Sequence, residues 1–240
     1  MDPKSPHRTR ERILALALKL FNEFGEPNVS TSMLADDLGI SPGNLYYHFR
    51  NKDDIVNCLF EAFEKSITTL IATPDERKAD LDDAWQTLQA FFALTWRYRF
   101  LYRDMNDLLY RNRNLEVHFK TILDRKIEIA HRLCKGLRKT GDMKIDEQDL
   151  PVVATNLALI ATYWASFDYA RDPRHVEQRL QQSINQGVYQ VLFLLKPYIQ
   201  GPTSARFNTL VERCVSQSQE EDGLNNLNSV IKPIFPEPAH

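Results

Sequence analysis

The sequence has little glycine, little cysteine and almost no net charge, and each shortage excludes a class of protein. Eight glycines in 240 residues, together with apolar residues spaced three to four apart along most of the chain, indicate an all-α fold. The formal charge is −2, from 30 Lys and Arg against 32 Asp and Glu. This balance excludes a protein that holds nucleic acid by bulk positive charge, and it leaves room for a small DNA-reading site on a neutral chain.

The small number of cysteines argues against a fold stabilised by disulfides or by a bound metal. Cys58, Cys134 and Cys214 are odd in number, lie far apart and form no CxxC pair. We therefore expect no disulfide framework, no metal site and no cofactor. Such cysteine usage is typical of a reducing compartment, and the polar N-terminus is followed by no signal-peptide core, so we expect a cytoplasmic protein.

One uncharged run has the minimum length of a membrane span. Residues 150–167 contain no charged side chain, which reaches that length limit. Polar residues such as Asn156 and Thr162 interrupt the run, and Asp149 and Asp168 bound it. We predict a buried helix of a soluble protein here, and no membrane partner.

Four helices are expected in the first 72 residues. An amphipathic stripe predicts a first helix that ends at Gly25. Ser30 is placed to cap a second helix, which Gly39 ends. A Ser-Pro start signal predicts a third helix over about 42–49, and Asn51 would cap the fourth.

A polar break over 73–80 separates these helices from a longer helical region. The expected longer helices cover about 81–97, 99–111, 114–139, 147–170 and 175–199, with a weaker signal over 203–217. The tail after about residue 218 is polar and rich in proline, so we expect it to be loosely ordered.

The second and third helices, joined by a glycine turn, form a helix-turn-helix pattern. Leu45 and Phe49 share the inward face of the third helix, which leaves the rest of that helix for DNA. The N-terminal end of such a helix enters the major groove first, and Asn44 there can form a bidentate pair with adenine. The residues on or near the open face are Pro42, Gly43, Asn44, Tyr46, Tyr47 and His48.

Two stretches carry a resemblance to a known family. ILALALKLFNEFG and TSMLADDLGISPGNLYYHFRNKDDI resemble the DNA-binding domain of the TetR family of bacterial transcriptional regulators, over about residues 12–56. The most specific piece is S-x-G-N-L-Y-Y-H-F-x-x-K-x-x-I, from Ser41 to Ile55.

The resemblance implies a domain plan and a function. The plan is an N-terminal three-helix helix-turn-helix DNA-binding domain (1–52), a connecting helix (53–72), a larger C-terminal helical ligand-binding and dimerisation domain (73–217) and a tail (218–240). The implied function is that of a homodimeric repressor, not an enzyme. It would bind a (pseudo)palindromic double-stranded DNA operator, associate with the bacterial nucleoid when bound, and be released by a small-molecule effector.

The resemblance also assigns DNA contacts by position. Ser30, Thr31 and Ser32 would contact phosphates, and Lys52 would hold a phosphate at the start of the fourth helix. The groove-facing set is Gly43, Asn44, Tyr46, Tyr47 and His48. Tyr46 could instead pack against the fourth helix. Arg8 and Arg10 could form a basic N-terminal arm or be ordinary surface residues.

Two late helices resemble the pair that forms a four-helix dimer interface in this family. The candidate interface residues are Leu157, Ile160, Trp164, Ile184, Val188, Val191 and Leu195. The alternative is that both helices form the core of one subunit. The candidates for an effector pocket, chosen as aromatic side chains, are Trp85, Phe92, Trp96, Tyr110, Phe119, Tyr163 and Trp164. For each residue taken alone, ordinary core is the favoured alternative, because aromatic content does not locate a pocket.

Two further points leave alternatives open. Residues 97–139 hold twelve Lys or Arg and five Asp or Glu, which indicates a solvated helix face, a site for an acidic ligand or a supporting role near DNA. Residues 1–52 carry a net charge of only +1, from seven basic and six acidic residues, so a dimeric adaptor with a degenerate helix-turn-helix is the alternative function. No metal spacing, nucleophile elbow or Gly-rich phosphate loop supports an enzyme.

Overall fold

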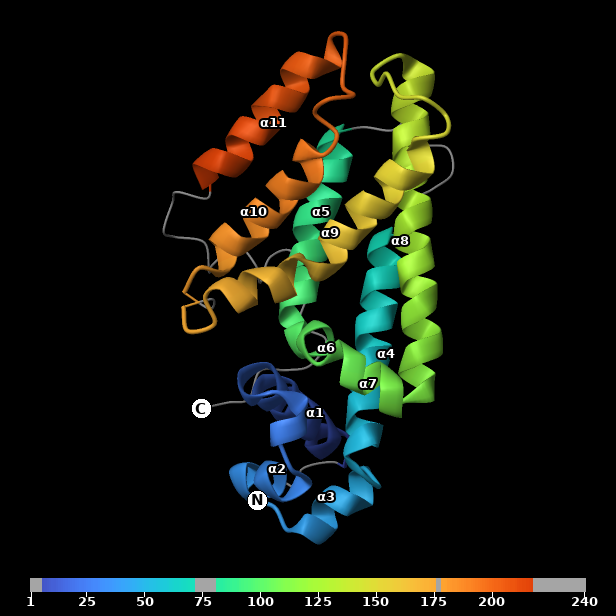
Figure 1. The fold of residues 1–240 in the computed structure, drawn as a ribbon. Coiled ribbons are helices and arrows are strands. Elements are labelled where there is room, and N and C mark those ends of the chain that lie inside the picture. Colours follow the sequence, from blue (N-terminus) through green and yellow to red (C-terminus); the bar gives the residue numbers. More distant parts are fainter. Residues whose placement is uncertain (1–5, 72–80, 176–177, 218–240) are drawn as a thin grey trace. The chain divides into compact units, whose positions relative to one another are not determined.

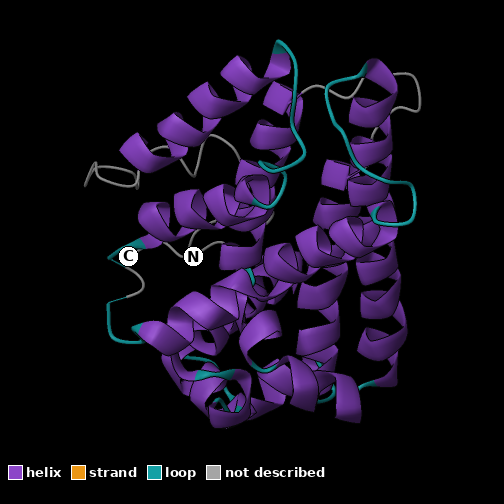
Figure 2. Ribbon diagram, turned by 45° about the horizontal axis from the view of Figure 1, so that its top comes forward, coloured by secondary structure: helices purple, strands orange, loops and turns teal. Residues whose placement is uncertain are grey.

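The computed structural model describes residues 6–71, 81–175 and 178–217, and the elements in these ranges are helices joined by loops (Figures 1 and 2). The only extended pairing among the described residues is an isolated bridge between Met143 and Ile199. The all-α fold expected from the sequence is confirmed. The expected polar break over 73–80 and the expected tail from 218 lie outside the described residues.

The chain divides into two compact units. Among the described residues, unit 1 covers 6–66 and 97–119, and unit 2 covers all the others. Unit 1 contains α1 (Pro6–Phe24), the 3₁₀ helix η1 (Glu26–Asn28), α2 (Thr31–Leu38), α3 (Pro42–His48), most of α4 (Lys52–Ile71), α6 (Arg99–Arg103), α7 (Met105–Arg111) and the start of α8 (Arg113–Thr140).

Side-chain caps start the short helices of unit 1 where the sequence predicts them. Ser30 Oγ accepts a hydrogen bond from Met33 N at 3.1 Å, and Ser41 Oγ accepts one from Asn44 N at 3.2 Å. Asn51 Oδ1 accepts from Asp54 N at 2.8 Å. Each cap satisfies an amide that the helix itself leaves unpaired.

Gly39 makes the turn between α2 and α3. Its backbone has φ 62° and ψ 38°, the left-handed conformation that costs glycine least. Its N–H bonds back to carbonyls of α2, which closes the end of that helix.

The core of unit 1 includes residues from both parts of the sequence. Phe21 and Phe100 lie 5.3 Å apart between ring centroids, and Phe63 and Tyr98 lie 5.6 Å apart. All four side chains are fully buried. The segment 97–119 therefore shares a core with the helix-turn-helix, which a boundary drawn at residue 52 does not show. The domain boundaries expected from the sequence stay predictions.

Unit 2 contains α5 (Leu81–Arg97) up to Trp96, most of α8, α9 (Leu150–Arg171), α10 (Leu180–Phe193) and α11 (Thr203–Gln217). Helices α9 and α10 pack closely at Gly187, where an added Cβ would lie 2.7 Å from Trp164 Cδ1 and 2.9 Å from Phe92 Cε1. Trp164 Nε1 donates to Ser183 O at 2.9 Å across the same contact. Only glycine fits at position 187 without a shift of these rings.

Two loops of unit 2 are joined by backbone hydrogen bonds. Lys144 N donates to Tyr198 O at 2.8 Å, and Gln200 N donates to Asp142 O at 2.9 Å. These bonds flank the Met143–Ile199 bridge. The loop after α8 and the loop after α10 are therefore held together as one unit.

Two helix predictions need correction. The helix expected over 99–111 is two helices, because Asp104 leaves the helical path and its carboxylate accepts a hydrogen bond from Glu26 N at 2.9 Å. The helix expected over 175–199 covers only Leu180–Phe193. Pro197 lacks an amide proton and disfavours helix at the residue before it, and residues 194–198 form turns instead.

Among the described residues, α9 is the one helix long and apolar enough to cross a membrane. It has 22 residues, its mean hydropathy reaches 1.4 over an 18-residue window, and 44% of that window is buried. Core helices of soluble proteins have the same length and composition, so this is weak support for a span.

Candidate nucleic-acid interface

Helix α3 is anchored in the core by one buried side chain and exposes polar and aromatic side chains to solvent. Leu45 is fully buried and anchors the helix, whereas Tyr46 is 51% and Tyr47 76% exposed. Gly43 and Asn44 are also exposed, and His48 is half-buried beside Tyr47 with ring centroids 5.1 Å apart. The residues predicted to face a groove thus lie on one short helix, and all of them except His48 are exposed.

Tyr46 contacts α2. Its hydroxyl lies 3.1 Å from Thr31 Oγ1, close enough for a hydrogen bond in which either group donates. Ser30 and Ser32 are exposed beside Thr31 at the start of α2. The hydrogen bond connects the N-terminus of α2 to the open face of α3.

Lys52 is engaged within the protein. Its Nζ donates to the carbonyl oxygen of Glu26 at 2.9 Å and lies 3.0 Å from Glu26 Oε1. The Lys52 side chain remains 24% exposed, whereas that of Glu26 is fully buried. Phosphate binding by Lys52 stays a prediction, and a phosphate there would have to compete with or share this contact.

Glu26 also binds Arg111, a partner that sequence patterns did not indicate. Arg111 Nη2 donates to Glu26 Oε2, and the same guanidinium pairs with Asp53 at 3.1 Å and Asp107 at 3.0 Å. Burial opposes the charge on Arg111, but the hydrogen bond and charge of Glu26, with Asp53 and Asp107, outweigh burial and raise its pKa. Glu26 and Arg111 are 85 positions apart, so no local spacing could have linked them.

A second set of polar contacts holds the end of α1 to α6. Asn22 Nδ2 donates to Arg97 O at 2.8 Å, and Asn22 Oδ1 accepts from Phe100 N at 3.1 Å. Arg103 Nη1 donates to Asn22 O at 3.2 Å, and its Nη2 donates to Phe21 O. The Phe21 carbonyl also accepts from Gly25 N at 3.0 Å, so Arg103 adds a second donor to it. These bonds tie residues 97–103 to the helix that supports α2 and α3.

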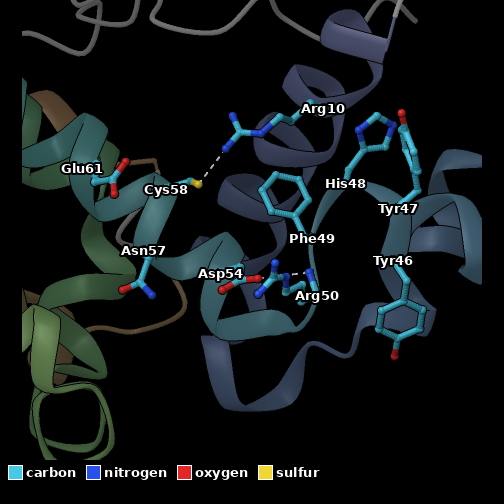
Figure 3. A pocket seen from close by; sticks show the side chains of 10 residues that line it. All are labelled: Arg10, Tyr46, Tyr47, His48, Phe49, Arg50, Asp54, Asn57, Cys58 and Glu61. Atoms are coloured by element: carbon cyan, nitrogen blue, oxygen red, sulfur yellow. Dashed lines mark hydrogen bonds between the residues drawn. The ribbon is translucent and has the colours of Figure 1, made fainter.

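The proposed basic arm is not extended. Arg8 and Arg10 both lie inside α1, which begins at Pro6. Arg10 Nη2 donates to Cys58 Sγ at 2.9 Å, and its guanidinium carbon lies 4.9 Å from the centre of the Phe49 ring (Figure 3). Since a helical arginine held in this way cannot act as a free arm, that interpretation of Arg10 is wrong.

The residues predicted to form a dimer interface are mostly core of one chain. Six of the seven are buried in unit 2 and Ile160 is half-buried. The buried six are Leu157, Trp164, Ile184, Val188, Val191 and Leu195. This burial supports the alternative interpretation of these residues, as the core of one subunit, and their assignment to a dimer interface stays a prediction.

A different stripe of α9 is exposed. Val152 (60%), Leu159 (53%), Tyr163 (43%) and Phe167 (55%) are large apolar residues in contact with solvent. Their spacing of seven, four and four residues puts them on one helix face. Helix α9 is apolar on nearly every side, so hydrophobic periodicity alone could not tell this face from the buried one.

The residues predicted to line an effector pocket belong to both units. Tyr110 and Phe119 are part of unit 1, and the other five are part of unit 2. Tyr110 is 93% exposed, and Phe119 packs in the core against Tyr102. The assignment of these two residues to an effector pocket stays a prediction.

The five candidates in unit 2 also differ in environment. Phe92 and Trp164 are buried around Gly187, where the packing is tight. Tyr163 belongs to the exposed stripe of α9, and Trp85 is half-buried with the Arg213 guanidinium 5.3 Å from its ring centre. Trp96 is half-buried.

The basic segment 97–139 contains one lysine that is not solvated. Lys126 is buried, its Nζ lies 3.2 Å from Thr162 Oγ1 and 4.6 Å from the centre of the Phe91 ring. Burial lowers the pKa of Lys126 to about 7. Most of its basic neighbours on α8, such as Lys120 and Arg125, are exposed, in agreement with a solvated face. Within the described ranges, no group of three or more His, Cys, Asp or Glu side chains could hold a metal ion.

Two family models match the chain. The family described as bacterial regulatory proteins, tetR family, matches residues 13–59. The family described as bacterial transcriptional repressor matches residues 62–207, more than half of the sequence. Together the two matches cover the helix-turn-helix and most of the helices that follow it.

Curated relatives match over part of their length. The HTH-type transcriptional regulator SAB2452 of Staphylococcus aureus is 33% identical over 86 residues, which are 36% of this chain and 45% of the relative. The tetracycline repressor protein class C of Escherichia coli is 34% identical over 96 residues, 40% of this chain and 41% of the relative. The chain thus spans less than half of the length of these relatives.

Solved structures match over most of the chain. A TetR-family transcriptional regulator from Marinobacter aquaeolei VT8 is similar with a TM-score of 0.76 and 33% identity, over 86% of this chain and 98% of that one. CprB from Streptomyces coelicolor, solved in complex with its biological operator sequence, has a TM-score of 0.62 and 19% identity over 87% and 96% of the two chains. At that identity CprB shows only that the fold is shared.

Proposed function

This chain belongs to the TetR family of bacterial transcriptional regulators, and on that premise we propose that it is a homodimeric, ligand-responsive repressor. It binds a (pseudo)palindromic operator through two copies of α3, and a small-molecule effector releases it. It acts by binding rather than by catalysis, in the bacterial cytoplasm and on the nucleoid when DNA-bound. Repression is favoured over activation because the family model over residues 62–207 is described as a transcriptional repressor.

The exposed face of α3 is the observation that supports this function best. Tyr47 is 76% exposed, whereas Leu45 on the same helix is fully buried. The buried Leu45 anchors α3 and leaves Tyr47 exposed to solvent. Asn44 can pair with adenine in the major groove, and Tyr47 and His48 can reach thymine methyls or phosphates. Gly43 lets the DNA backbone come close to the start of α3. Tyr46, whose hydroxyl is hydrogen-bonded to Thr31, would lie between the α3 residues that contact the major groove and the α2 residues that contact the DNA phosphates.

Phosphate contacts would come from helix N-termini. The start of α2, with Ser30, Thr31 and Ser32, offers hydroxyls and free amides to one phosphate. Lys52, in the first turn of α4, would turn from Glu26 toward a second. Arg111 would keep the buried Glu26 carboxylate paired while Lys52 is engaged by DNA.

Dimerisation would use the exposed face of α9. Leu159, Tyr163 and Phe167 form an apolar stripe that a second copy of the chain can cover. Two-fold symmetry is required for two α3 helices to enter successive major grooves about 34 Å apart. An effector that binds unit 2 in only one of two dimer arrangements would change that spacing, and DNA would weaken effector binding by the same factor.

Selection from a random DNA library tests the central claim. The full chain is incubated with a pool of random 40-base-pair duplexes, bound DNA is amplified over several rounds, and the enriched sequences are aligned. We expect a sequence with two inverted half-sites. Fluorescence anisotropy should then show that Asn44→Ala weakens binding to this sequence by about 10-fold or more while binding to random DNA is unchanged.

The other outcomes of this experiment are equally informative. A chain that binds every duplex alike, or none, would be the dimeric adaptor with a degenerate helix-turn-helix. A single half-site without symmetry would contradict the dimer. Asn44→Ala and the wild type should have the same thermal unfolding midpoint, because Asn44 is exposed.

A further inference from the structure

A hollow beside α3 is lined by residues of three helices of unit 1. Its volume is about 420 Å³. Arg10 comes from α1, His48 from α3, and Cys58 and Glu61 from α4, while Phe49 and Arg50 follow directly after α3 (Figure 3). The hollow therefore adjoins the end of α3 opposite to Asn44, and residues of the open face form part of its wall.

Arg10 is held in place on one side of this hollow. Its Nη2 donates to Cys58 Sγ at 2.9 Å, and its guanidinium lies over the Phe49 ring at 4.9 Å. A thiol sulfur is a weak acceptor and takes one of the five N–H groups of a guanidinium. Within the part of the chain that the structure describes, no carboxylate lies within ion-pair distance of Arg10. The Arg10 side chain is therefore preorganised to bind an anion, because binding would cost it little further conformational entropy.

Arg50 supplies a second cation to the same hollow. Its backbone N–H donates to Asp54 Oδ2 at 3.1 Å, which fixes the chain just after α3, and its side chain is exposed. Planar guanidinium groups bind phosphate oxygens with two parallel hydrogen bonds. Arg10 and Arg50 thus offer two such forks beside the face that carries Tyr47 and His48 (Figure 3).

The acidic residues in the wall narrow the choice of anion. Asp54 and Glu61 line the hollow together with Arg10 and Arg50, so the charges of the two carboxylates and the two guanidinium groups cancel. A free phosphate dianion gains little from a site of no net charge. A phosphodiester carries a single charge and is brought to the site by the other contacts of the duplex, so it needs only local hydrogen-bond donors.

We propose that Arg10 and Arg50 bind phosphodiester groups of the DNA backbone next to the bases that α3 reads. This inference rests on the proposed function and extends it to two arginines outside the helix-turn-helix face. In this arrangement α1 contributes to DNA binding through Arg10, a residue inside the helix whose side chain is held in place by Cys58 and Phe49.

The salt dependence of DNA binding tests this assignment. Anisotropy titrations with the enriched duplex are run at several salt concentrations from 50 to 200 mM, for the wild type, Arg10→Gln and Arg50→Gln. Each lost phosphate contact makes the slope of log K against log salt less steep by about 0.9. A homodimer carries each substitution twice, so the slope of each variant should be less steep by about 1.8. The ratio of the affinities at 50 and 200 mM should then fall by about 12-fold for each variant.

Lys19→Gln is the matched control. Lys19 is exposed on α1 nine residues after Arg10, which is half a turn from Arg10 around the helix axis. The Lys19→Gln variant removes one positive charge, as Arg10→Gln does, but from the opposite face of α1. Its slope of log K against log salt should equal that of the wild type. Arg10→Lys should keep the slope and lose part of the affinity, since it retains the charge without the fork. If Arg10→Gln and Arg50→Gln both have the slope of Lys19→Gln, the assignment is wrong.

The failures of the two proposals are distinguishable. A wild-type chain that does not bind DNA overturns the proposed function, whereas a wild-type chain that binds with unchanged slopes in the variants overturns only this inference. Arg50→Gln changes an exposed side chain, so it tests the assignment even if Arg10→Gln unfolds. Inorganic phosphate at 10 mM should not protect the wild type from thermal unfolding more than sodium chloride of equal ionic strength; specific protection lost in Arg10→Gln would instead indicate a site for free phosphate.

Discussion

Arg111 and Glu26 form an ion pair in which the carboxylate is fully buried and the guanidinium side chain is 31% exposed. The same carboxylate faces Lys52, so one buried anion holds the first turn of α4 and the end of α7. Lys52 is also the residue proposed to bind a phosphate, so the Glu26 carboxylate contacts both α7 and a proposed DNA-binding side chain.

Replacing the buried carboxylate should destabilise the protein. Glu26→Gln keeps the size of the side chain but leaves Lys52 and Arg111 without their shared anion. We expect the free energy of unfolding in urea to fall by about 1–3 kcal/mol, since charged hydrogen bonds are lost from partly exposed cations. Glu23→Gln, at an exposed position of α1, should change it by less than about 0.5 kcal/mol. Equal effects of the two substitutions would contradict the role given to Glu26.

The close approach of α9 and α10 predicts a strong effect at Gly187. Gly187→Ala would place Cβ 2.7 Å from Trp164 and 2.9 Å from Phe92, so both rings must shift. We expect a loss of about 1–3 kcal/mol in thermal or urea unfolding, typical of an overpacked core. Gly43→Ala meets only Ser41 Oγ at 3.9 Å and should be neutral or slightly stabilising. A stable Gly187→Ala protein would show that the two helices can separate at little cost.

Stability should rise with pH above neutrality because of Lys126. Its pKa is about 7 in the folded protein against 10.5 for an ordinary lysine, so between these values the unfolded chain binds more protons. The penalty for burying the charged amine is complete below pH 7 and declines as pH rises through that range. The free energy of unfolding should therefore be higher at pH 8.5 than at pH 7, by at most about 1.4 kcal/mol per pH unit. Lys126→Met should lack this rise, and an identical pH profile for the two proteins would show that the amine is charged when folded.

The exposed stripe of α9 predicts how to make a monomer. Leu159→Glu and Tyr163→Glu put a charge on the face proposed to meet a second copy, so sedimentation velocity should show half the mass of the wild type. Val117→Glu changes a residue of similar exposure, 48%, on α8 and should leave the mass unchanged. A dimeric Leu159→Glu protein would exclude this face as the interface.

Local signals in the sequence predicted most of unit 1. Caps at Ser30, Ser41 and Asn51, and the left-handed turn at Gly39, depend on residues within four positions of each other, and all four are confirmed. The open face of α3 followed from the same reasoning, because burying Leu45 fixes which side chains point outward.

Contacts between distant segments could not be predicted in the same way. The break at Asp104 depends on a hydrogen bond to Glu26, 78 positions away. On α9, Leu157 is buried and Leu159 exposed, although both belong to one apolar run. Which side faces the core depends on where α10 packs, and that depends on Gly187, which gives no pattern in hydrophobicity.

The hydrogen bonds between the loop after α8 and the loop after α10 affect how proteases can act on unit 2. A protease needs several residues of extended, unpaired backbone in its cleft, and loops on the surface are its usual targets. Here Lys144 is bonded to Tyr198 and Gln200 to Asp142, so cutting one loop requires opening both. The loop after α8 should therefore survive brief trypsin treatment despite the exposed Lys144 that it carries.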